Sequence, residues 1–463
     1  MNTAVSESTS VDTRAALRLI TCGSVDDGKS TLIGRLLVDS KAVLQDHLAG
    51  VQRQGETDLA LLTDGLSAER EQGITIDVAY RYFSTETRKF IIGDAPGHEQ
   101  YTRNMVTAAS SADAAVVLVD ATKLPWQDAG LALLPQTRRH SLLLKLLRVP
   151  SVVFAINKLD AVADSALAYR HIADALATFA RDAGIAVAAT VPVSALKGWN
   201  VVDAAADAGW CGYQGPTLLD ILEHLPVTRP DTGLPFSFPV QWVEKPGAPT
   251  LGAGASSLPP EGAAQPWGGP AAAPSSSSDT SQGRRTFWGR VATGAAQPGQ
   301  AVRVLPSNQT AVIAQVLDHV RQPGDVAASH SAGIVLDREV DVSRGDWLLA
   351  DASGDGSLPE ASRQLRATVA WLDDEPLVPG RVYWALHGHR WVKAKVQRIV
   401  HKLDIHTLAE QDATQLEPNA IGHIELALQE SLVTLPYNQS RALGALVLVD
   451  TASHKTAGAL MVL

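Results

Sequence analysis

Residues 23–30 constrain the fold of this chain more than any other stretch. They read Gly-Ser-Val-Asp-Asp-Gly-Lys-Ser, which matches the phosphate-binding pattern G-x-x-x-x-G-K-S. Residues 17–22 are apolar and partly β-branched, which predicts a strand, and residues 29–37 have helical spacing. Between a strand and a helix, such a loop turns backbone N–H groups toward phosphate oxygens. The residues expected to hold phosphate are Gly23, Ser24, Val25, Asp26, Asp27, Gly28, Lys29, Ser30 and Thr31.

Strand and helix patterns alternate from residue 15 to residue 229, which predicts an α/β domain with a mostly parallel sheet. Strands are expected at residues 17–22, 77–84, 89–94, 114–120, 152–157 and 186–193. Helices are expected at residues 29–37, 101–109, 131–147, 166–183 and 217–225. In sheets of this kind ligands bind outside the carboxyl ends of the strands, so the motifs at those ends carry the most information.

The first such motif is Asp94-Ala95-Pro96-Gly97-His98, directly after an apolar strand. Asp94 is suited to the Mg²⁺ shell, and Ser30 is expected to ligate the ion directly. Gly97 lets its backbone N–H approach a γ-phosphate, because no Cβ intervenes. His98 is expected to position the attacking water, although a structural loop histidine is the simpler alternative.

Two later motifs indicate that the base is guanine. Asn157-Lys158-Leu159-Asp160 and Ser194-Ala195-Leu196-Lys197 each follow a predicted strand. The Asp160 carboxylate only accepts hydrogen bonds, which suits the two N–H donors on the guanine edge. Lys158 can lay its stem along the base, and the N–H of Ala195 is expected to donate to guanine O6. The expected base-binding residues are Asn157, Lys158, Asp160, Ser194, Ala195 and Leu196.

A long segment without clean periodicity separates the first helix from residue 77. It contains Glu69-Arg70-Glu71-Gln72-Gly73-Ile74-Thr75-Ile76. A threonine hydroxyl near a flexible glycine can close over Mg²⁺ and the γ-phosphate and open after hydrolysis. We assign this role to Thr75, which completes a predicted catalytic set of Lys29, Thr75 and His98. The alternative is a long surface loop with a solvated cluster of charges.

After residue 230 the pattern changes to short β runs separated by turns, which predicts barrels. The expected units are a first barrel at residues 230–350 and a second at residues 351–463. Residues 247–283 are dominated by Gly, Ala, Pro and Ser, which predicts a disordered insertion, a partner-contacting loop being the alternative. His387, His389, His401 and His406 lack clean ligand spacing, so core or surface roles are favoured over metal binding.

Composition excludes several classes of protein. The formal charge of −10 argues against a broad nucleic-acid-binding face, so no nucleic-acid partner is expected. The two cysteines, Cys22 and Cys211, do not suggest a disulfide framework, and residues 1–14 read as a flexible tail without a secretory signal. No uncharged apolar run approaches the ~20 residues that span a bilayer, so we expect a cytoplasmic protein without a membrane partner.

With these motifs in place, the chain resembles the translation-factor class of GTPases. More narrowly, it resembles the GTPase subunit family of bacterial sulfate adenylyltransferase. That branch carries Asp27 where the wider class usually has His. The runs Gly97-His98-Glu99-Gln100-Tyr101-Thr102-Arg103-Asn104-Met105 and Gln136-Thr137-Arg138-Arg139-His140-Ser141 are also typical of it.

The resemblance implies a regulatory subunit that binds GTP and Mg²⁺ and pairs with a small, ATP-using catalytic subunit in a heterodimer or larger assembly. The partner would form adenylylsulfate and pyrophosphate from ATP and sulfate, driven by GTP hydrolysis in this chain. It also implies no catalytic role for residues 136–141. The alternatives are a translation-factor-like protein acting with tRNA or the ribosome, and a GTP-binding scaffold.

Three features of this sequence are compared with those of the family. Ala95 stands where relatives usually have Thr, at a position not expected to touch the chemistry. Residues 122–134 are longer than the usual turn, which suggests a surface extension. No second G-x-x-x-x-G-K-[ST] pattern occurs, so the fused adenylylsulfate-kinase domain of some relatives is expected to be absent.

Overall fold

The structure is a computed structural model that describes residues 16–41, 52–53, 56–57, 59, 78–97, 102–205, 210–228, 231–245, 284–351, 361–404 and 409–463. Thr75, His98, the expected tail at residues 1–14 and the expected insertion at residues 247–283 lie outside these ranges. Within the described part of the chain, no helix has the length and apolarity needed to cross a bilayer.

The first unit is a six-stranded α/β sheet, here called the α/β unit, with strand order β4-β5-β1-β6-β7-β8. Only β4 runs antiparallel to its neighbour, which confirms the predicted mostly parallel sheet. Every residue of β6 and β7 is buried, as expected for central strands covered on both faces. The strands are β1 (Leu17–Cys22), β4 (Ala79–Ser84), β5 (Lys89–Asp94), β6 (Ala114–Asp120), β7 (Ser151–Asn157) and β8 (Val187–Val193).

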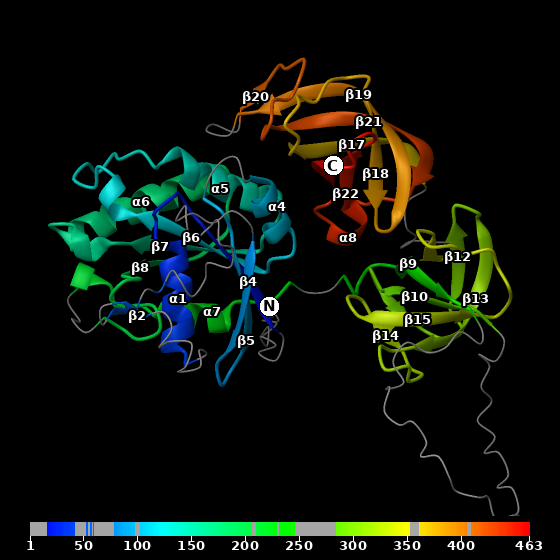
Figure 1. Ribbon diagram of the computed structural model, residues 1–463, viewed down its shortest axis with the longest axis horizontal. Helices are drawn as coiled ribbons and strands as arrows, with labels where there is room; N and C mark the ends of the chain where they lie inside the picture. The colour runs from blue at the N-terminus through cyan, green and yellow to red at the C-terminus, as the bar shows by residue number, and fades with distance from the viewer. Residues whose placement is uncertain are drawn as a thin grey trace, which may run out of the picture.

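Helices cover both faces of this sheet (Figure 1). One hydrophobic cluster joins α1 (Lys29–Asp39) and α7 (Leu218–His224) to one face. A second cluster joins α4 (Thr102–Ser110), α5 (Pro135–Leu146) and α6 (Ser165–Ala183) to the other. The short elements are η3 (Ala121–Lys123), η4 (Leu159–Ala161), η5 (Trp210–Gly212), β2 (Gln52–Arg53) and β3 (Glu56–Thr57).

The expectation of a helix from residue 131 is wrong, because α5 begins at Pro135. Proline fits the first turn of a helix and disfavours helical geometry in the residue before it. Leu134 accordingly has extended backbone angles, φ −60° and ψ 143°. Leu131 and Leu133 are still buried, so their apolar spacing reflects core packing of an irregular segment and not helix.

The first barrel closes in the strand order β10-β15-β13-β12-β16-β9. Its interior is a single cluster of buried aliphatic and aromatic side chains. The ring strands are β9 (Ser237–Glu244), β10 (Thr286–Arg290), β12 (Ala301–Leu305), β13 (Gln309–Leu317), β15 (Ser331–Leu336) and β16 (Trp347–Ala350), with β11 (Ala295–Ala296) and β14 (Val326–Ala327) pairing separately.

The second barrel has the strand order β18-β22-β23-β17-β21-β19-β20, and pairing of β18 with β19 closes the ring. The two barrels confirm the predicted fold class. The elements are β17 (Ser362–Trp371), β18 (Val382–His387), β19 (Arg390–Leu403), β20 (Glu410–Gln411), β21 (Ile421–Leu432), α8 (Arg441–Gly444), β22 (Ala445–Asp450) and β23 (Thr456–Val462).

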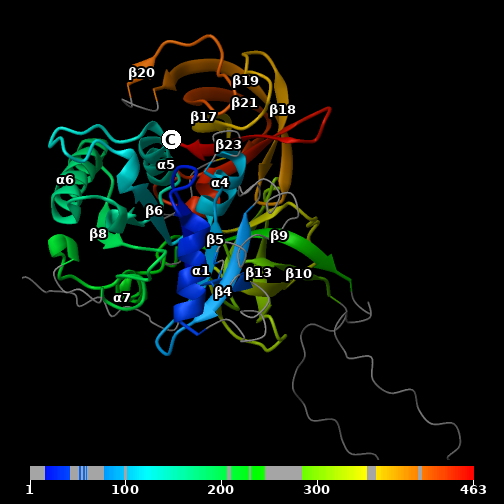
Figure 2. The ribbon, with the colours of Figure 1, turned by 60° about the vertical axis from the view of Figure 1, so that its left-hand side comes forward.

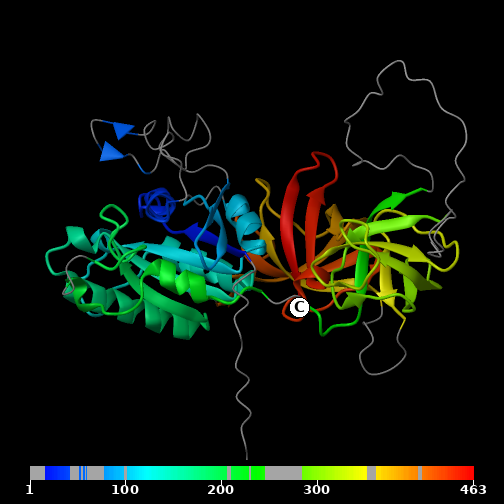
Figure 3. The ribbon, with the colours of Figure 1, turned by 90° about the horizontal axis from the view of Figure 1, so that it is seen from below.

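The second barrel lies between the α/β unit and the first barrel (Figures 1 and 3). On one side, Arg148 Nη1 donates to Tyr437 O at 2.7 Å, and Tyr437 Oη donates to Leu147 O at 3.2 Å. On the other side, the His387 ring stacks on Trp347 with centroids 4.8 Å apart. Figure 2 shows the second barrel next to α4 and α5, at the edge of the α/β unit. The three units therefore make direct contacts through the second barrel.

Candidate nucleotide-binding site

The phosphate loop connects the carboxyl end of β1 to α1, as the motif predicts. Gly28 has φ 92°, and a Cβ there would lie 2.5 Å from Asn157 Nδ2. A Cβ on Gly97 would lie 2.7 Å from Lys29 Nζ and 3.0 Å from Val25 N. Two segments far apart in sequence thus approach each other at glycines, forming a backbone cradle of the kind that takes phosphate oxygens.

Lys29 is buried at the centre of this cradle. Its Nζ donates to Ser24 O at 2.7 Å and to Gly23 O at 3.3 Å. Burial lowers the pKa of Lys29, while the carboxylates of Asp94 and Asp27 oppose that shift. Desolvation of an ammonium strengthens its interaction with a nearby anion, so Lys29 is placed to stabilise negative charge on a phosphate.

Two side-chain oxygens next to Lys29 form a donor set that suits Mg²⁺. Ser30 Oγ donates to Asp94 Oδ2 at 3.1 Å, and Thr21 Oγ1 donates to Asp94 Oδ1 at 3.0 Å. Hydroxyl and carboxylate oxygens are the hard ligands that Mg²⁺ prefers. The residues present therefore fit the ion, and Thr21, which the sequence reasoning missed, orients the carboxylate from inside β1.

The Asp27 side chain makes contacts within the phosphate loop and with Lys123. Ser24 N donates to Asp27 Oδ2 at 2.6 Å, and Lys123 Nζ lies 3.0 Å from Asp27 Oδ1. Burial raises the pKa of Asp27, an effect that Lys123 opposes more than any other group. Lys123 also donates to Val25 O. No sequence motif contains Lys123, and the signal that could have identified it is its place just after the strand end at Asp120.

Asn157 and Lys158 hold the loop from the side of the predicted base. Asn157 Nδ2 donates to Asp27 O at 2.8 Å, and Asn157 Oδ1 accepts from Ala195 N at 3.0 Å. Lys158 Nζ donates to Asp26 O at 2.6 Å and to Asp120 Oδ2 at 2.7 Å. Asn157 thus links three segments, which indicates a positioning role in addition to any contact with a nucleotide.

The predicted guanine-reading residues are brought together at the same edge. Asp160 Oδ2 lies 3.5 Å from Lys197 Nζ, which in turn lies 4.4 Å from the centre of the Trp199 ring. The Ala195 N–H already donates to Asn157 Oδ1. If it also donates to guanine O6, as predicted, the two acceptors must share this one donor. Arg35 Nε donates to Ala195 O at 3.2 Å, which ties this loop to α1.

The remaining predicted residues lie as follows. Ala95 and Pro96 are buried, with Ala95 N donating to Thr21 O at 3.1 Å, which fits a supporting position for Ala95. Thr31 is half-buried in the first turn of α1, and Leu196 is exposed. His98 and Thr75 fall outside the described residues, so their roles stay predictions.

The run at residues 136–141 approaches the site more closely than expected. Gln136 Nε2 donates to Gly97 O at 3.4 Å, which places α5 against the segment after β5. His140 is buried on the same helix, and burial, then the charges of Lys29 and Arg139, lower its pKa to about 3. A neutral buried imidazole fits a packing role, and the absence of a catalytic role for this run stays a prediction.

Comparisons with known proteins agree with this geometry. The family "Elongation factor Tu GTP binding domain" matches residues 14–227, and the family "GTP-eEF1A C-terminal domain-like" matches residues 364–463. The first match shows that the α/β unit is a GTP-binding domain, in agreement with the guanine prediction.

Relatives match nearly the whole chain. The sulfate adenylyltransferase subunit 1 of Laribacter hongkongensis is 38% identical over 459 residues, covering 97% of this chain and 86% of the relative. That of Erwinia tasmaniensis is 40% identical over 458 residues, with 97% and 86% covered. The bifunctional enzyme CysN/CysC of Xylella fastidiosa is 42% identical, and the match covers 96% of this chain but 65% of that enzyme. The chain therefore belongs to the sulfate adenylyltransferase subunit 1 family of GTPases.

Proposed function

We propose that this chain is the GTP-hydrolysing regulatory subunit of a sulfate adenylyltransferase. A separate, small catalytic subunit would make adenylylsulfate and pyrophosphate from ATP and sulfate. The observation that carries the proposal is the buried Lys29 ammonium beside the Ser30–Asp94 oxygen pair, in a chain that matches this family over 97% of its length. The translation-factor alternative is not favoured, because the near-full-length relatives carry sulfate adenylyltransferase names.

The chemistry follows from the residues of the cradle. In-line attack of water forms a bond to the γ-phosphorus while the bond to the β–γ bridging oxygen breaks, giving GDP and inorganic phosphate. Lys29 and the loop amides stabilise the charge that develops on the phosphate oxygens. Ser30 would ligate Mg²⁺, and Asp94 would hold its water shell. Bound Mg²⁺ would supply further positive charge to stabilise the phosphate oxygens.

Two further roles complete the mechanism. His98 is proposed to position the attacking water, and Thr75 to close over the ion and the γ-phosphate. Asp160 is proposed to accept from the guanine N–H groups, a role supported by its place beside Lys197 at the base end of the site. Release of the two loops after hydrolysis is the switch through which the chain would act on its partner.

Coupling requires a partner whose reaction responds to this switch. Formation of adenylylsulfate from ATP and sulfate is unfavourable, and GTP hydrolysis supplies a driving reaction. We infer that the complex works in the cytoplasm, which is supported by two free, buried cysteines, Cys22 and Cys211, in the described structure. A slow GTP-binding scaffold remains the competing function for the same site.

The test uses this chain co-purified with its native partner. Sulfate-dependent pyrophosphate release from ATP is followed with GTP, without GTP, and with a non-hydrolysable GTP analogue. Stimulation by GTP that the analogue does not sustain supports coupled hydrolysis. Equal stimulation by both would replace energy coupling with allosteric activation, and co-purification with RNA or ribosomes without sulfate-dependent release would contradict the proposal.

A further inference from the structure

A β-bulge in the second barrel places two histidines on the same outer face. Ile399 pairs with Ile424, but His401 pairs with His423, so β19 has one residue more than β21 at this point. Ile399 and Ile424 both belong to the barrel core. Because side chains alternate along a strand, His423 points outward, and the extra residue turns His401 outward beside it.

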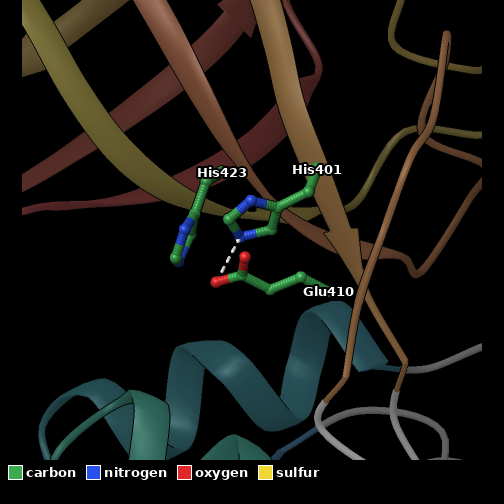
Figure 4. A group of neighbouring side chains, drawn as sticks. All are labelled: His401, Glu410 and His423. Carbon is green, nitrogen blue, oxygen red and sulfur yellow. Dashed lines mark ion pairs between the residues drawn. The ribbon is translucent and has the colours of Figure 1, made fainter.

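A carboxylate completes the group. Glu410 on β20 pairs with Leu403 on β19, which puts it diagonally next to His401. Glu410 Oε1 lies 3.4 Å from His401 Nε2, and the two imidazole rings have centroids 4.3 Å apart (Figure 4). One potential ligand atom from each residue lies within 4.8 Å of the others. Three neighbouring strands therefore present two nitrogens and one oxygen toward a common point.

The environment of His401 is unusual for a surface histidine. Its Nε2 is buried and has no hydrogen-bond partner among the described residues, although it faces the Glu410 carboxylate. A buried polar atom without a partner is costly, so it calls for a ligand or a proton. The site lies toward the α/β unit, since Leu403 and Ile421, the neighbours on these strands, pack into that unit's hydrophobic cluster.

We propose that His401, Glu410 and His423 form a binding site for a divalent transition-metal ion, with Zn²⁺ as its preferred occupant. Zinc binds histidine nitrogen and carboxylate oxygen at about 2.0–2.2 Å, so two ligands on a tetrahedral ion lie about 3.3 Å apart. The separation of 3.4 Å between His401 Nε2 and Glu410 Oε1 is close to this value. Small side-chain rotations bring His423 into range, and the exposed side of Glu410 leaves the fourth position to water.

An ion pair without metal explains less of the arrangement. An ion pair between His401 and Glu410 accounts for two of the three side chains and gives the adjacent His423 ring no role. A metal ion would use a nitrogen of His423 as well as the other two ligand atoms. A bound ion would link β19, β20 and β21 next to the α/β unit, independently of nucleotide chemistry.

The test measures Zn²⁺ binding by the untagged full chain, stripped with a chelator and then saturated with GDP and Mg²⁺. Competition against a chromophoric chelator gives the number of sites and their affinity. The variants are His423→Ala and Glu410→Gln, with His319→Ala, an exposed histidine of the first barrel, as the matched control. Wild type and control should each bind one Zn²⁺, and loss of a ligand should weaken binding by more than about 100-fold, since even outer-shell changes cost 10–100-fold.

Two outcomes would overturn the proposal. Either wild type binds no Zn²⁺ tightly, or both ligand variants bind it as well as the His319→Ala control does. Unchanged GDP affinity in each variant shows that the chain remains folded. Glu410→Gln guards against a folding artefact because the Glu410 side chain is 66% exposed. Co²⁺ in place of Zn²⁺ gives a second readout, because its visible absorption reports nitrogen and oxygen ligands in tetrahedral geometry.

Discussion

Replacement of Asn157 by alanine should separate a positioning role from direct reading of the base. The side chain is 3% exposed, and it joins Asp27 O at 2.8 Å to Ala195 N at 3.0 Å. Alanine leaves both backbone groups buried without this partner. The phosphate loop and the loop at residues 194–197 then lose the side chain that bridges them, although no residue within either loop is changed.

The size of the effect follows from the two hydrogen bonds. Leaving a buried donor or acceptor without a partner costs about 1–3 kcal/mol. For two such groups, partly relieved by water, we expect the free energy of unfolding to fall by about 2–4 kcal/mol. If about half of this loss weakens nucleotide binding, GDP affinity falls by roughly 5- to 30-fold.

A second buried asparagine in the same unit provides the control. Asn200 Nδ2 donates to Pro192 O at 3.1 Å, and Ala205 N donates to Asn200 Oδ1 at 3.0 Å. These bonds do not reach the phosphate loop. Asn200→Ala should therefore lower stability at least as much, partly because Asn200 has φ 54°, but should leave nucleotide affinity unchanged.

The assay combines urea unfolding with binding of fluorescent GDP and competition by inosine diphosphate, which lacks the 2-amino group. In Asn157→Ala, affinities for both nucleotides should fall by the same factor, because neither disturbed loop is predicted to contact the 2-amino group, which is where the two nucleotides differ. The reasoning is refuted if the ratio of the two affinities shifts, or if Asn157→Ala binds GDP as tightly as Asn200→Ala.

The remaining predictions concern selectivity, turnover and pH. Asp160→Asn should erode the preference for GTP over xanthosine triphosphate; unchanged relative affinities would show that Asp160 does not read the guanine edge. His98→Ala should keep GTP affinity but slow single-turnover hydrolysis, and a normal rate would remove its assigned role. Burial lowers the pKa of His387 to about 4 from 6.5, so unfolding takes up a proton below pH 6.5 and stability falls on acidification. From pH 6.5 to 5 the free energy of unfolding should fall by about 2 kcal/mol through this residue. His387→Gln should flatten the dependence of the urea midpoint on pH, and an unchanged slope would contradict the assignment to His387.

The sequence predicts well those parts of the fold whose signal lies in the local residue pattern. The strands β6 and β7 are continuous apolar runs between polar ends, and their predicted positions agree with the structure to within one residue. The motif residues follow strand ends, so parallel pairing brings them to one edge. Strand β23, by contrast, has a weak signal in the sequence, because its Ala and Gly residues have low β-propensity and its extended form rests on pairing with β17 and β22.

Other features could not be predicted because they depend on register and on contacts between distant segments. Lys123 reaches Asp27 across 96 residues of chain, and no local pattern indicates that pairing. His401 was weighed as a metal ligand and set aside for lack of spacing. Its neighbour His423 lies on another strand, and the bulge that aligns the two rings is visible only once β19 and β21 are paired.

The packing of the second barrel bears on how a nucleotide switch would reach a partner. Gly97, whose backbone N–H is predicted to approach the γ-phosphate, precedes α4 in the chain. Met105 and Ala109 of α4 lie in one hydrophobic cluster with Ile421 and Met461 of the second barrel. Close-packed protein interiors transmit a shift of a helix to the elements that it packs against. A movement of α4 would therefore displace the barrel as a whole, and Trp347, stacked on His387, extends the contact to the first barrel. A surface that binds the partner could therefore respond to hydrolysis without touching the nucleotide loops. In the described structure α4 contacts the second barrel, and the second barrel contacts the first.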